Sequence, residues 1–502
     1  MVIKNMKESN KCGYLKIAFM LIIYKSIRIK YVVLGAVFLI VILIGSVGCR
    51  KQLQIPPPYS SIVTSQVFKD SVDATSALLG IYSTLINTGT AMKFGSGAAT
   101  TFLGMASDEL VPFNKGDQQL IQFYNNTLLS TNSWVFIHFW QTTYSLIYRT
   151  NAIIDGLKNS TGIQPSVANE IIGEAKFFRS YFYFYLTNLF GDVPLILSTD
   201  YKTTLLASRT SKEQVYQQII NDLKDAQALL PDDYSAAGGE KIRANKWGAT
   251  SLLARVYLYH REWQQAETQS SAIINSDNYS LVSDLNSVFL TNSSEAIFQL
   301  SISSTTTNNA YNATPEGYNY VRLTPKPPTY YVSNTLLASF ENNDRRKVSW
   351  LDSTVYRGVA YYYPYKYKVG SAAAQANGTV TEYYMVLRLA EQYLIRAEAK
   401  AQQNIDLVGA VSDINVIRSR AGLDSLPSSL TQTEILQAIA QERKVEFFAE
   451  WGHRWLDLNR SGQSNDILPP IKPLWQSYQQ LFPIPFSELQ ADPNLIQNPG
   501  YN

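Results

Sequence analysis

Between residues 132 and 275, apolar side chains recur every three or four positions, and few folds accommodate so long a run of this pattern. Trp140, Tyr144 and Tyr148 show the spacing first, and Ile219 and Leu223 repeat it later. Such spacing places the apolar side chains on one face of an α-helix, whereas a strand needs alternation at every second residue. The sequence therefore predicts helix after helix across this region.

Two pairs of alanines indicate how the predicted helices pack. Ala254 and Ala266 fall in neighbouring helical segments separated by a short break, and Ala397 and Ala410 do the same near the C-terminus. Small residues at such positions let the two helices of a tetratricopeptide-type (TPR) hairpin cross closely. We therefore predict an all-α, TPR-like scaffold of helical hairpins over about 132–275 and again over about 385–460.

Two polar regions interrupt or follow this scaffold. Residues 276–380 are rich in Ser, Thr, Asn, Tyr and Pro and contain only short strand-like pieces, such as residues 296–302. Residues 461–502 are Pro-rich and irregular. Because loops on a rigid scaffold are the usual place for binding residues, we predict a large irregular ligand-binding insertion with minor short strands, and an irregular C-terminal segment.

The N-terminus predicts export and a lipid anchor. Residues 31–48 form an uncharged apolar run after three basic residues, which is the pattern of a signal peptide; an uncleaved membrane-spanning helix is the alternative. The segment SVGC, ending at Cys49, resembles a lipobox in which Ser46 replaces the usual Leu. We expect residues 1–48 to be a lipoprotein signal peptide and the polar, Pro-rich residues 49–66 to be a tether whose Cys49 carries acyl chains such as palmitate.

Composition and motifs argue against several other functions. The net charge is +3 and the basic residues are scattered, so there is no electrostatic footprint for nucleic acid. The three histidines, His138, His260 and His453, have no metal-ligand spacing. No P-loop, GxGxxG or GxSxG motif is present, and acylation of Cys49 would leave no thiol for catalysis. We therefore predict no metal site, no cofactor and no nucleic-acid partner.

Five segments of the chain have distinctive motifs, within the residue ranges 174–194, 243–266, 387–423, 442–460 and 481–502. One motif is FGDVP, which contains Gly191 and Pro194, and another is ERKVEFFAEWGHRWLDLNR, which begins at Glu442. A third is PIPFSELQADPNLIQNPGYN, over the last residues of the sequence. In their motifs and in their order, the five segments resemble the SusD/RagB family of outer-membrane nutrient-binding proteins.

The resemblance implies one SusD-like domain over residues 67–502, with a TPR-like helical scaffold and irregular loops. It implies a surface-exposed lipoprotein of the outer membrane that binds an oligosaccharide, or in some relatives a peptide. It also implies a partner, a SusC-like TonB-dependent transporter, to which the ligand is delivered. The resemblance implies binding without catalysis.

The family motifs themselves are interpreted as structural. Glu442, Glu446 and Glu450 share one helix face, and carboxylates on one face are poorly placed to flank a glycosidic bond. We expect them to form a partly buried charge network with nearby arginines, including Arg443 and Arg454, that holds the C-terminal helix to the scaffold. Gly191 and Pro194 are expected to end a helix.

The ligand is expected on two loop regions rich in aromatic residues, because sugars stack on aromatic rings and hydrogen-bond to nearby polar groups. One region follows Asp108-Glu109, a pair that either shapes the ligand face or caps a helix. The other is the insertion. The candidate ligand-binding residues are Trp350, Tyr318, Phe113, Tyr311, Tyr320, Asn114 and Arg322.

Two other classes of function remain as alternatives. A glycan-active enzyme or peptidase on a helical scaffold would need a convergent acid, base or nucleophile, and the sequence offers no motif for one. A TPR-type adaptor that binds only protein would not need the Tyr-, Asn- and Thr-rich insertion, although the sequence does not exclude it.

Overall fold

The computed structural model describes residues 68–86, 92–158, 160–302, 312–321, 326–371 and 378–501, together with positions 20, 24, 25 and 374. The chain divides into two units, Met1–Val63 and Thr64–Asn502, and the elements with defined bounds belong to the second. Cys49 and the predicted tether lie outside the described residues. Among the described helices, none combines the length and the apolar content required to cross a membrane.

A long helix of the second unit, α7, spans Pro165–Phe190. A proline in its first turn suits the helix start, and Gly191 ends it with a φ of 73°. Most of the C-terminal half of α7 is buried. The helices α3 (Ser71–Ile86) and α6 (Thr142–Lys158) pack directly on α7. The other helices before α7 are η1 (Phe94–Ala98), α4 (Ala99–Ala106), α5 (Gln118–Asn125) and η2 (Val135–Gln141).

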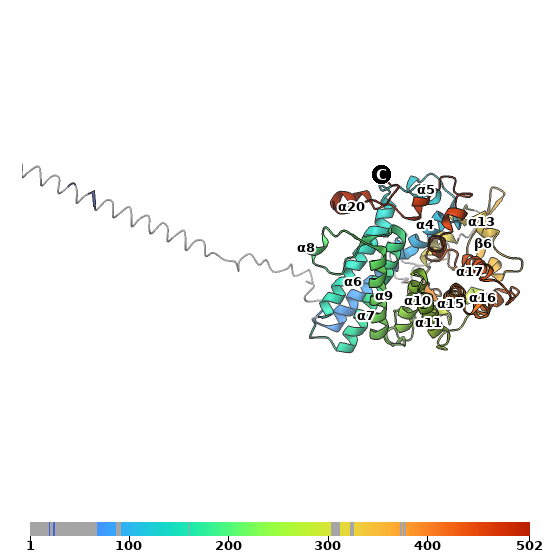
Figure 1. Cartoon of the computed structure of the whole chain (residues 1–502), viewed down its shortest axis with the longest axis horizontal. Helices are drawn as coiled ribbons and strands as arrows, with labels where there is room; N and C mark the ends of the chain where they lie inside the picture. Colours follow the sequence, from blue (N-terminus) through green and yellow to red (C-terminus); the bar gives the residue numbers. More distant parts are fainter. Residues whose placement is uncertain are drawn as a thin grey trace, which may run out of the picture. The chain divides into compact units, whose positions relative to one another are not determined.

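The scaffold continues as a series of helices, each packed on the next from α7 to α16 (Figure 1). The four alanines that predicted close helix crossings, Ala254, Ala266, Ala397 and Ala410, have no exposed surface. The prediction of an all-α, TPR-like scaffold is confirmed. The helices are α9 (Lys212–Leu229), α10 (Lys246–Tyr259), α11 (Trp263–Ile274), α15 (Leu389–Gln403), α16 (Leu407–Ala421) and α17 (Gln432–Glu446).

Short antiparallel strand pairs join distant segments. The strand piece predicted over residues 296–302 is β4, which spans Ala296–Leu300 and pairs with β8. The hairpin of β6 and β7 had no counterpart in the sequence prediction. The pairs are β1 (Leu110–Pro112) with β5 (Tyr330–Val332), β2 (Val193–Pro194) with β3 (Arg209–Thr210), β4 with β8 (Tyr384–Arg388), and β6 (Leu351–Tyr356) with β7 (Val359–Pro364).

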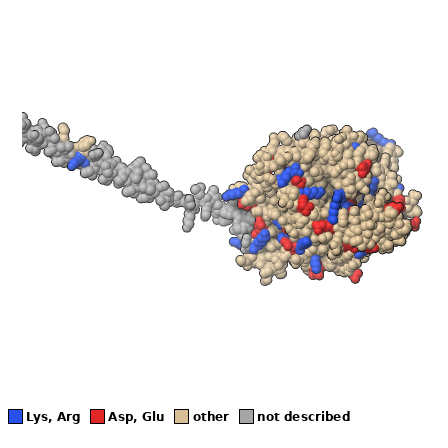
Figure 2. Space-filling view, in the orientation of Figure 1, with Lys and Arg blue, Asp and Glu red and all other residues tan. Residues whose placement is uncertain are grey.

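Single helical turns and short helices make up much of the rest. The C-terminal segment has only such short pieces after residue 461, as its irregular composition predicted. On the face seen in Figure 2, Lys and Arg lie interspersed with Asp and Glu. The remaining elements are α8 (Tyr201–Thr204), η3 (Ser235–Ala237), η4 (Leu285–Ser287), α12 (Pro315–Tyr320), α13 (Asn334–Leu337), α14 (Arg345–Ser349), α18 (His453–Arg460), α19 (Ser464–Ile467), η5 (Ser477–Gln480) and α20 (Phe486–Ala491).

Helix α3 buries one face. Leu78, Tyr82 and Ile86 are buried, but the apolar residues Val72 and Leu79 are exposed. The reason is that α3 packs against α6 and α7 on one side only, so apolar residues outside that face stay in solvent. An exposed apolar residue is ordinary in a folded protein.

Candidate functional site

Strand pairing brings the two predicted ligand-binding regions together. β1 pairs with β5, with Val111 opposite Tyr331, and the backbone N–H of Phe113 donates to the carbonyl of Thr329 at 3.0 Å. β5 in turn packs against β7. The loop after Glu109 and the insertion therefore form one continuous surface.

Four partly exposed rings make up this surface, which we call the aromatic surface: Phe113, Tyr331, Tyr356 and Tyr361. Phe113 meets Tyr356 and Tyr361 edge to face, with ring centroids 5.7 and 5.4 Å apart. Tyr361 also meets Tyr331 edge to face at 5.1 Å. Because each ring contacts another, their orientations are held before any ligand arrives.

The turn of the β6–β7 hairpin places Tyr356 and Tyr361. Arg357 and Gly358 adopt left-handed conformations, with φ of 49° and 79°, as a two-residue turn of type I′ requires. Tyr361 pairs with Thr354 across the hairpin. An Arg-Gly pair between two Tyr- and Val-containing runs is a recognisable hairpin signal in the sequence, and it was missed.

A cavity of about 230 Å³ borders the aromatic surface. The Nζ of Lys472 donates to the carbonyls of Met105 and Tyr124 at 2.7 and 2.6 Å, and it lies 4.0 Å from the centre of the Tyr124 ring. Burial lowers the pKa of Lys472 to about 7. Neither Lys472 nor Tyr124 was among the candidate residues predicted from the sequence. The cavity is lined by Ser107, Asp108, Leu110, Val111, Tyr124, Tyr331, Ser333, Asn334, Thr335, Ile471 and Lys472.

Asp108 and Glu109 anchor this surface to the C-terminal helices. Asp108 is buried and accepts hydrogen bonds from Arg454 at 2.7 and 3.0 Å, and Lys444 lies 2.9 Å away. Burial raises the pKa of Asp108, but the two cations outweigh it and hold the pKa below its ordinary value. Burial and the charge of Asp108 raise the pKa of Glu109 to about 8. The pair therefore orders the ligand loop from within, and neither side chain is open to solvent.

The Glu/Arg motif residues form a buried ionic network around Glu446. Its carboxylate accepts from Arg388 at 2.6 Å and Arg346 at 3.0 Å, and it also pairs with Arg420. Burial raises its pKa, but the three guanidinium groups together hold it well below the ordinary range. Glu442 pairs with Arg346 at 2.5 Å. The network joins α17 to β8, α16 and α14.

Trp350 covers this network and is not part of a ligand surface. Its exposed fraction is 0%, and its indole Nε1 donates to the carbonyl of Leu285 at 2.9 Å. The Nζ of Lys366 lies 4.6 Å from its ring centre. Tyr320 is also buried, 2% exposed, and its hydroxyl lies 2.7 Å from that of Thr101. The ligand-binding predictions for Trp350 and Tyr320 are wrong, because both rings are buried and expose no face on which a sugar could stack.

The other predicted positions fall into three groups. Phe113 lies in the aromatic surface, and Asn114 beside it is exposed and accepts a hydrogen bond from the backbone N–H of Gly116 at 2.9 Å. Tyr318 is partly buried in α12. Tyr311 and Arg322 lie outside the described residues.

The remaining motif residues have structural positions. Arg443 is buried, and its Nε donates to Asp457 at 2.7 Å. Pro194 pairs with Arg209 in the β2–β3 ladder, directly after the turn at Gly191. These positions connect α7, α17 and α18 to their neighbours and do not reach the aromatic surface.

Comparison with known proteins places the chain among its relatives. A family described as "Starch-binding associating with outer membrane" matches residues 83–258, and the "SusD family" matches residues 338–501. SusD-like protein P2 of Formosa agariphila is 27% identical, over 92% of this chain and 98% of its own length. The starch-binding protein SusD of Bacteroides thetaiotaomicron is 35% identical over 23% of this chain and 21% of its own.

Solved structures share the fold. A SusD superfamily protein from Bacteroides vulgatus has a TM-score of 0.73 at 24% identity, covering 86% of this chain and all of the other (100%). A structure named "Laminarin binding SusD-like protein" has a TM-score of 0.71 at 25% identity, with the same coverage of 86% and 100%. With its TPR-like scaffold, its order of motifs and these matches, the chain belongs to the SusD/RagB family.

Proposed function

We propose that this protein captures oligosaccharides at the bacterial surface and delivers them to a SusC-like TonB-dependent transporter. The observation that carries the proposal is the aromatic surface of Phe113, Tyr331, Tyr356 and Tyr361. The starch-binding description of the matching family and the laminarin-binding relative support a carbohydrate as the ligand.

The geometry of the rings suits a sugar ligand. Tyrosine and phenylalanine offer flat apolar faces on which the CH groups of a sugar ring stack, and the tyrosine hydroxyls can hydrogen-bond to its hydroxyl groups. The edge-to-face contacts hold Tyr361 between Phe113 and Tyr331. Rings already held in place lose little conformational freedom on binding, which favours affinity.

The carboxylates of the motif region support binding without catalysis. Glu442, Glu446 and Glu450 are buried and each is paired with arginine or lysine. A glycosidase needs two carboxyl groups that face a bond from opposite sides of a cleft. Carboxylates held by cations inside the protein are not available for that role.

The anchor and the partner complete the proposal. Acylation of Cys49 would hold the protein at the outer membrane, which agrees with the membrane association named in the matching family's description. The test is metabolic labelling of the wild-type chain and the variant Cys49→Ser with a palmitate analogue. Labelling of the variant would contradict lipidation at Cys49. Co-purification of a TonB-dependent transporter with the protein from outer membranes tests the partner.

Ligand capture is tested by titrating the purified protein with laminarin and soluble starch in a calorimeter. Tyr361→Ala removes the central ring, and we expect a loss of affinity of about fivefold, since an aromatic contact contributes about 1 kcal/mol and a tenfold change would need about 1.4 kcal/mol. Tyr201→Ala is the matched control, because Tyr201 is exposed on α8, at the opposite side of the view in Figure 1 from β6. Equal affinity of both variants for every bound polysaccharide would contradict the proposed surface.

A further inference from the structure

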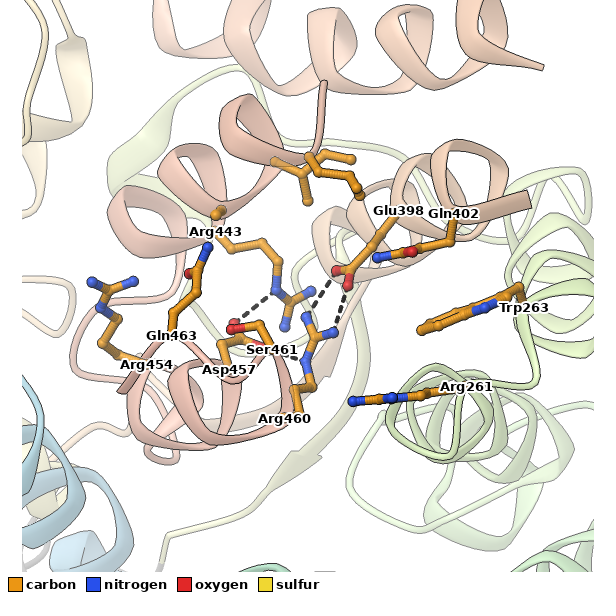
Figure 3. A pocket seen from close by; sticks show the side chains of 13 residues that line it. Arg261, Trp263, Glu398, Gln402, Arg443, Arg454, Asp457, Arg460, Ser461 and Gln463 are labelled. Atoms are coloured by element: carbon orange, nitrogen blue, oxygen red, sulfur yellow. Dashed lines mark hydrogen bonds and ion pairs between the residues drawn. The ribbon is translucent and has the colours of Figure 1, made fainter. Parts of the chain in front are cut away.

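A second cavity, of about 350 Å³, lies in the helical scaffold between α11, α15, α17 and α18. It shares no lining residue with the cavity beside the aromatic surface. We call it the arginine cavity, and Figure 3 shows it from close by. It is lined by Arg261, Trp263, Glu398, Gln402, Leu436, Ile439, Ala440, Arg443, Arg454, Asp457, Arg460, Ser461 and Gln463.

The charges of the lining do not balance. Arg454 is paired with Asp108, which does not line the cavity. Arg460 is held by both oxygens of Glu398, at 2.5 and 2.8 Å, and by Asp457 at 2.8 Å. Asp457 also pairs with Arg443. Apart from Arg454, the lining contains three arginines, Arg261, Arg443 and Arg460. Its only two carboxylates are those of Glu398 and Asp457, so one positive charge in the lining has no counter-charge there.

Arg261 supplies that extra charge. Its side chain is exposed and forms no ion pair with any of the described residues. In Figure 3 its guanidinium lies below Trp263, to the right of Arg460. Its backbone has a φ of 64°, in the left-handed region that non-glycine residues seldom adopt. The chain therefore holds an uncompensated cation at the edge of the cavity in an uncommon backbone conformation.

Arg443 adds a second, independent observation. It is 3% exposed, and its Nη1 and Nη2 have no hydrogen-bond partner among the described residues. Figure 3 shows its guanidinium next to that of Arg460 at the inner wall. Buried donors without acceptors are costly, and charged N–H groups bind oxyanions through strong hydrogen bonds. An oxyanion would satisfy both features, because it would accept hydrogen bonds from the Arg443 N–H groups and would balance the positive charge of Arg261.

Trp263 and three neutral polar residues complete the lining. The Trp263 ring is half-buried and lies to the right of Arg460 in Figure 3. Gln402, Ser461 and Gln463 offer amide and hydroxyl groups. A cavity with one aromatic wall and a few convergent polar groups is the usual form of a small-ligand site.

We propose that the arginine cavity binds an oxyanion, a sulfate or carboxylate, either free or carried by an acidic sugar. Arg261 and Arg460 make the charged contacts, and the negative charge lies beside the unpaired N–H groups of Arg443. The proposal does not rest on sugar binding at the aromatic surface, since the two sites are built from different residues.

Calorimetric titration of the purified protein with sodium sulfate and with sodium glucuronate, at constant ionic strength, tests the proposal. We expect saturable binding at one site and a loss of at least about tenfold in Arg261→Gln, because a charge-assisted contact is removed. Arg261 is exposed, so this variant leaves the buried ion pairs intact. The matched control is Lys224→Gln, which removes an exposed charge from α9, and its affinity should stay within about twofold of the wild type.

Trp263→Ala distinguishes the two sources of the anion. A selective loss of glucuronate affinity assigns the site to an acidic sugar, whereas an unchanged preference assigns it to a free oxyanion. Absence of saturable binding of both probes overturns the proposal, as does an equal effect of Arg261→Gln and Lys224→Gln. Tyr361→Ala should leave sulfate binding unchanged, so failure of polysaccharide binding would not be mistaken for failure of this site.

Discussion

The carboxylate of Asp108 receives two hydrogen bonds from the guanidinium of Arg454, at 2.7 and 3.0 Å, and so joins two cavities of the protein. Asp108 lines the cavity beside the aromatic surface, and Arg454 lines the arginine cavity. Both side chains, Asp108 and Arg454, are buried. It ties the loop that carries Phe113 to α18, and through α18 to the motif helices.

Replacement of Asp108 by Asn should therefore destabilise the whole protein. The variant leaves Arg454 and Lys444 buried without a counter-charge, which costs about 3–5 kcal/mol. The measurement is the urea midpoint of unfolding. Asp117→Asn is the control on the same loop, because Asp117 is exposed and only caps α5, a role that Asn fills equally well. Similar midpoints for the two variants would contradict this account.

The same pair predicts a pH dependence of stability. Burial raises the pKa of Asp108, but Arg454 and Lys444 outweigh it, so the folded-state pKa lies below the ordinary value of about 4. The stabilisation is therefore complete above about pH 4 and is lost as the pH falls further. We expect the difference in unfolding free energy between wild type and Asp108→Asn to shrink as the pH falls below about 4. A difference that persists unchanged at lower pH would rule out this linkage.

Trp350→Ala should act on stability and not selectively on ligand binding. The ring is fully buried against Lys366 and the ionic network, and loss of a large buried side chain costs about 3–5 kcal/mol. The partly buried Trp247 on α10 provides the matched control, and its replacement by Ala should cause a smaller loss. Thermal unfolding and laminarin titration of the folded fraction separate the two effects. A stable variant with weaker glycan binding would restore Trp350 as a ligand residue.

Trp350 also shows why the burial of a candidate ligand-binding residue was hard to predict from the sequence. A tryptophan in a polar, charged segment is equally consistent with an exposed stacking ring and with a ring that covers buried charges. The choice depends on Lys366, Arg388 and Arg420, whose side chains lie within 5.9 Å of the ring centre. No local pattern reveals a contact among segments so far apart in the chain.

The scaffold was predictable for the opposite reason. Helical periodicity and the small residues Ala254 and Ala397 are local features of the sequence. They indicate which face of each helix is buried. The pairing of β1 with β5 is not local, yet it creates the aromatic surface from Phe113 and Tyr331. The two loops could be named from composition, but their contact could not.

Glu446 offers a direct test of the motif region. Glu446→Gln keeps the shape of the side chain but removes the charge shared by Arg346, Arg388 and Arg420, and we expect a loss of about 3–5 kcal/mol. Glu434→Gln on the same helix is the control, because Glu434 is exposed in a capping box, and its effect should stay within about 0.5 kcal/mol. Urea unfolding measures both. Equal effects would mean that the network contributes no more than a surface carboxylate.

The variant Gly452→Ala tests how tightly the turn between α17 and α18 is packed. Ala449, Trp451 and Gly452 all have positive φ, of 50°, 48° and 70°, and Gly452 is the N-cap of α18. A Cβ at Gly452 would collide with the side chain of Leu103 in α4. Gly452→Ala therefore adds both left-handed strain, about 1–2 kcal/mol, and overpacking, about 1–3 kcal/mol.

Gly462→Ala separates these two contributions. Gly462 has a similar φ of 77°, but no atom lies within 4 Å of its added Cβ, so this variant adds only the left-handed strain. The difference in unfolding free energy between Gly452→Ala and Gly462→Ala measures the energetic cost of the steric overlap with Leu103. Because α4 leads directly into Asp108 and the ligand loop, a displaced α4 should also weaken glycan binding in Gly452→Ala while Gly462→Ala binds normally. Equal stability and equal binding in the two variants would show that the turn and α4 adjust freely to one another.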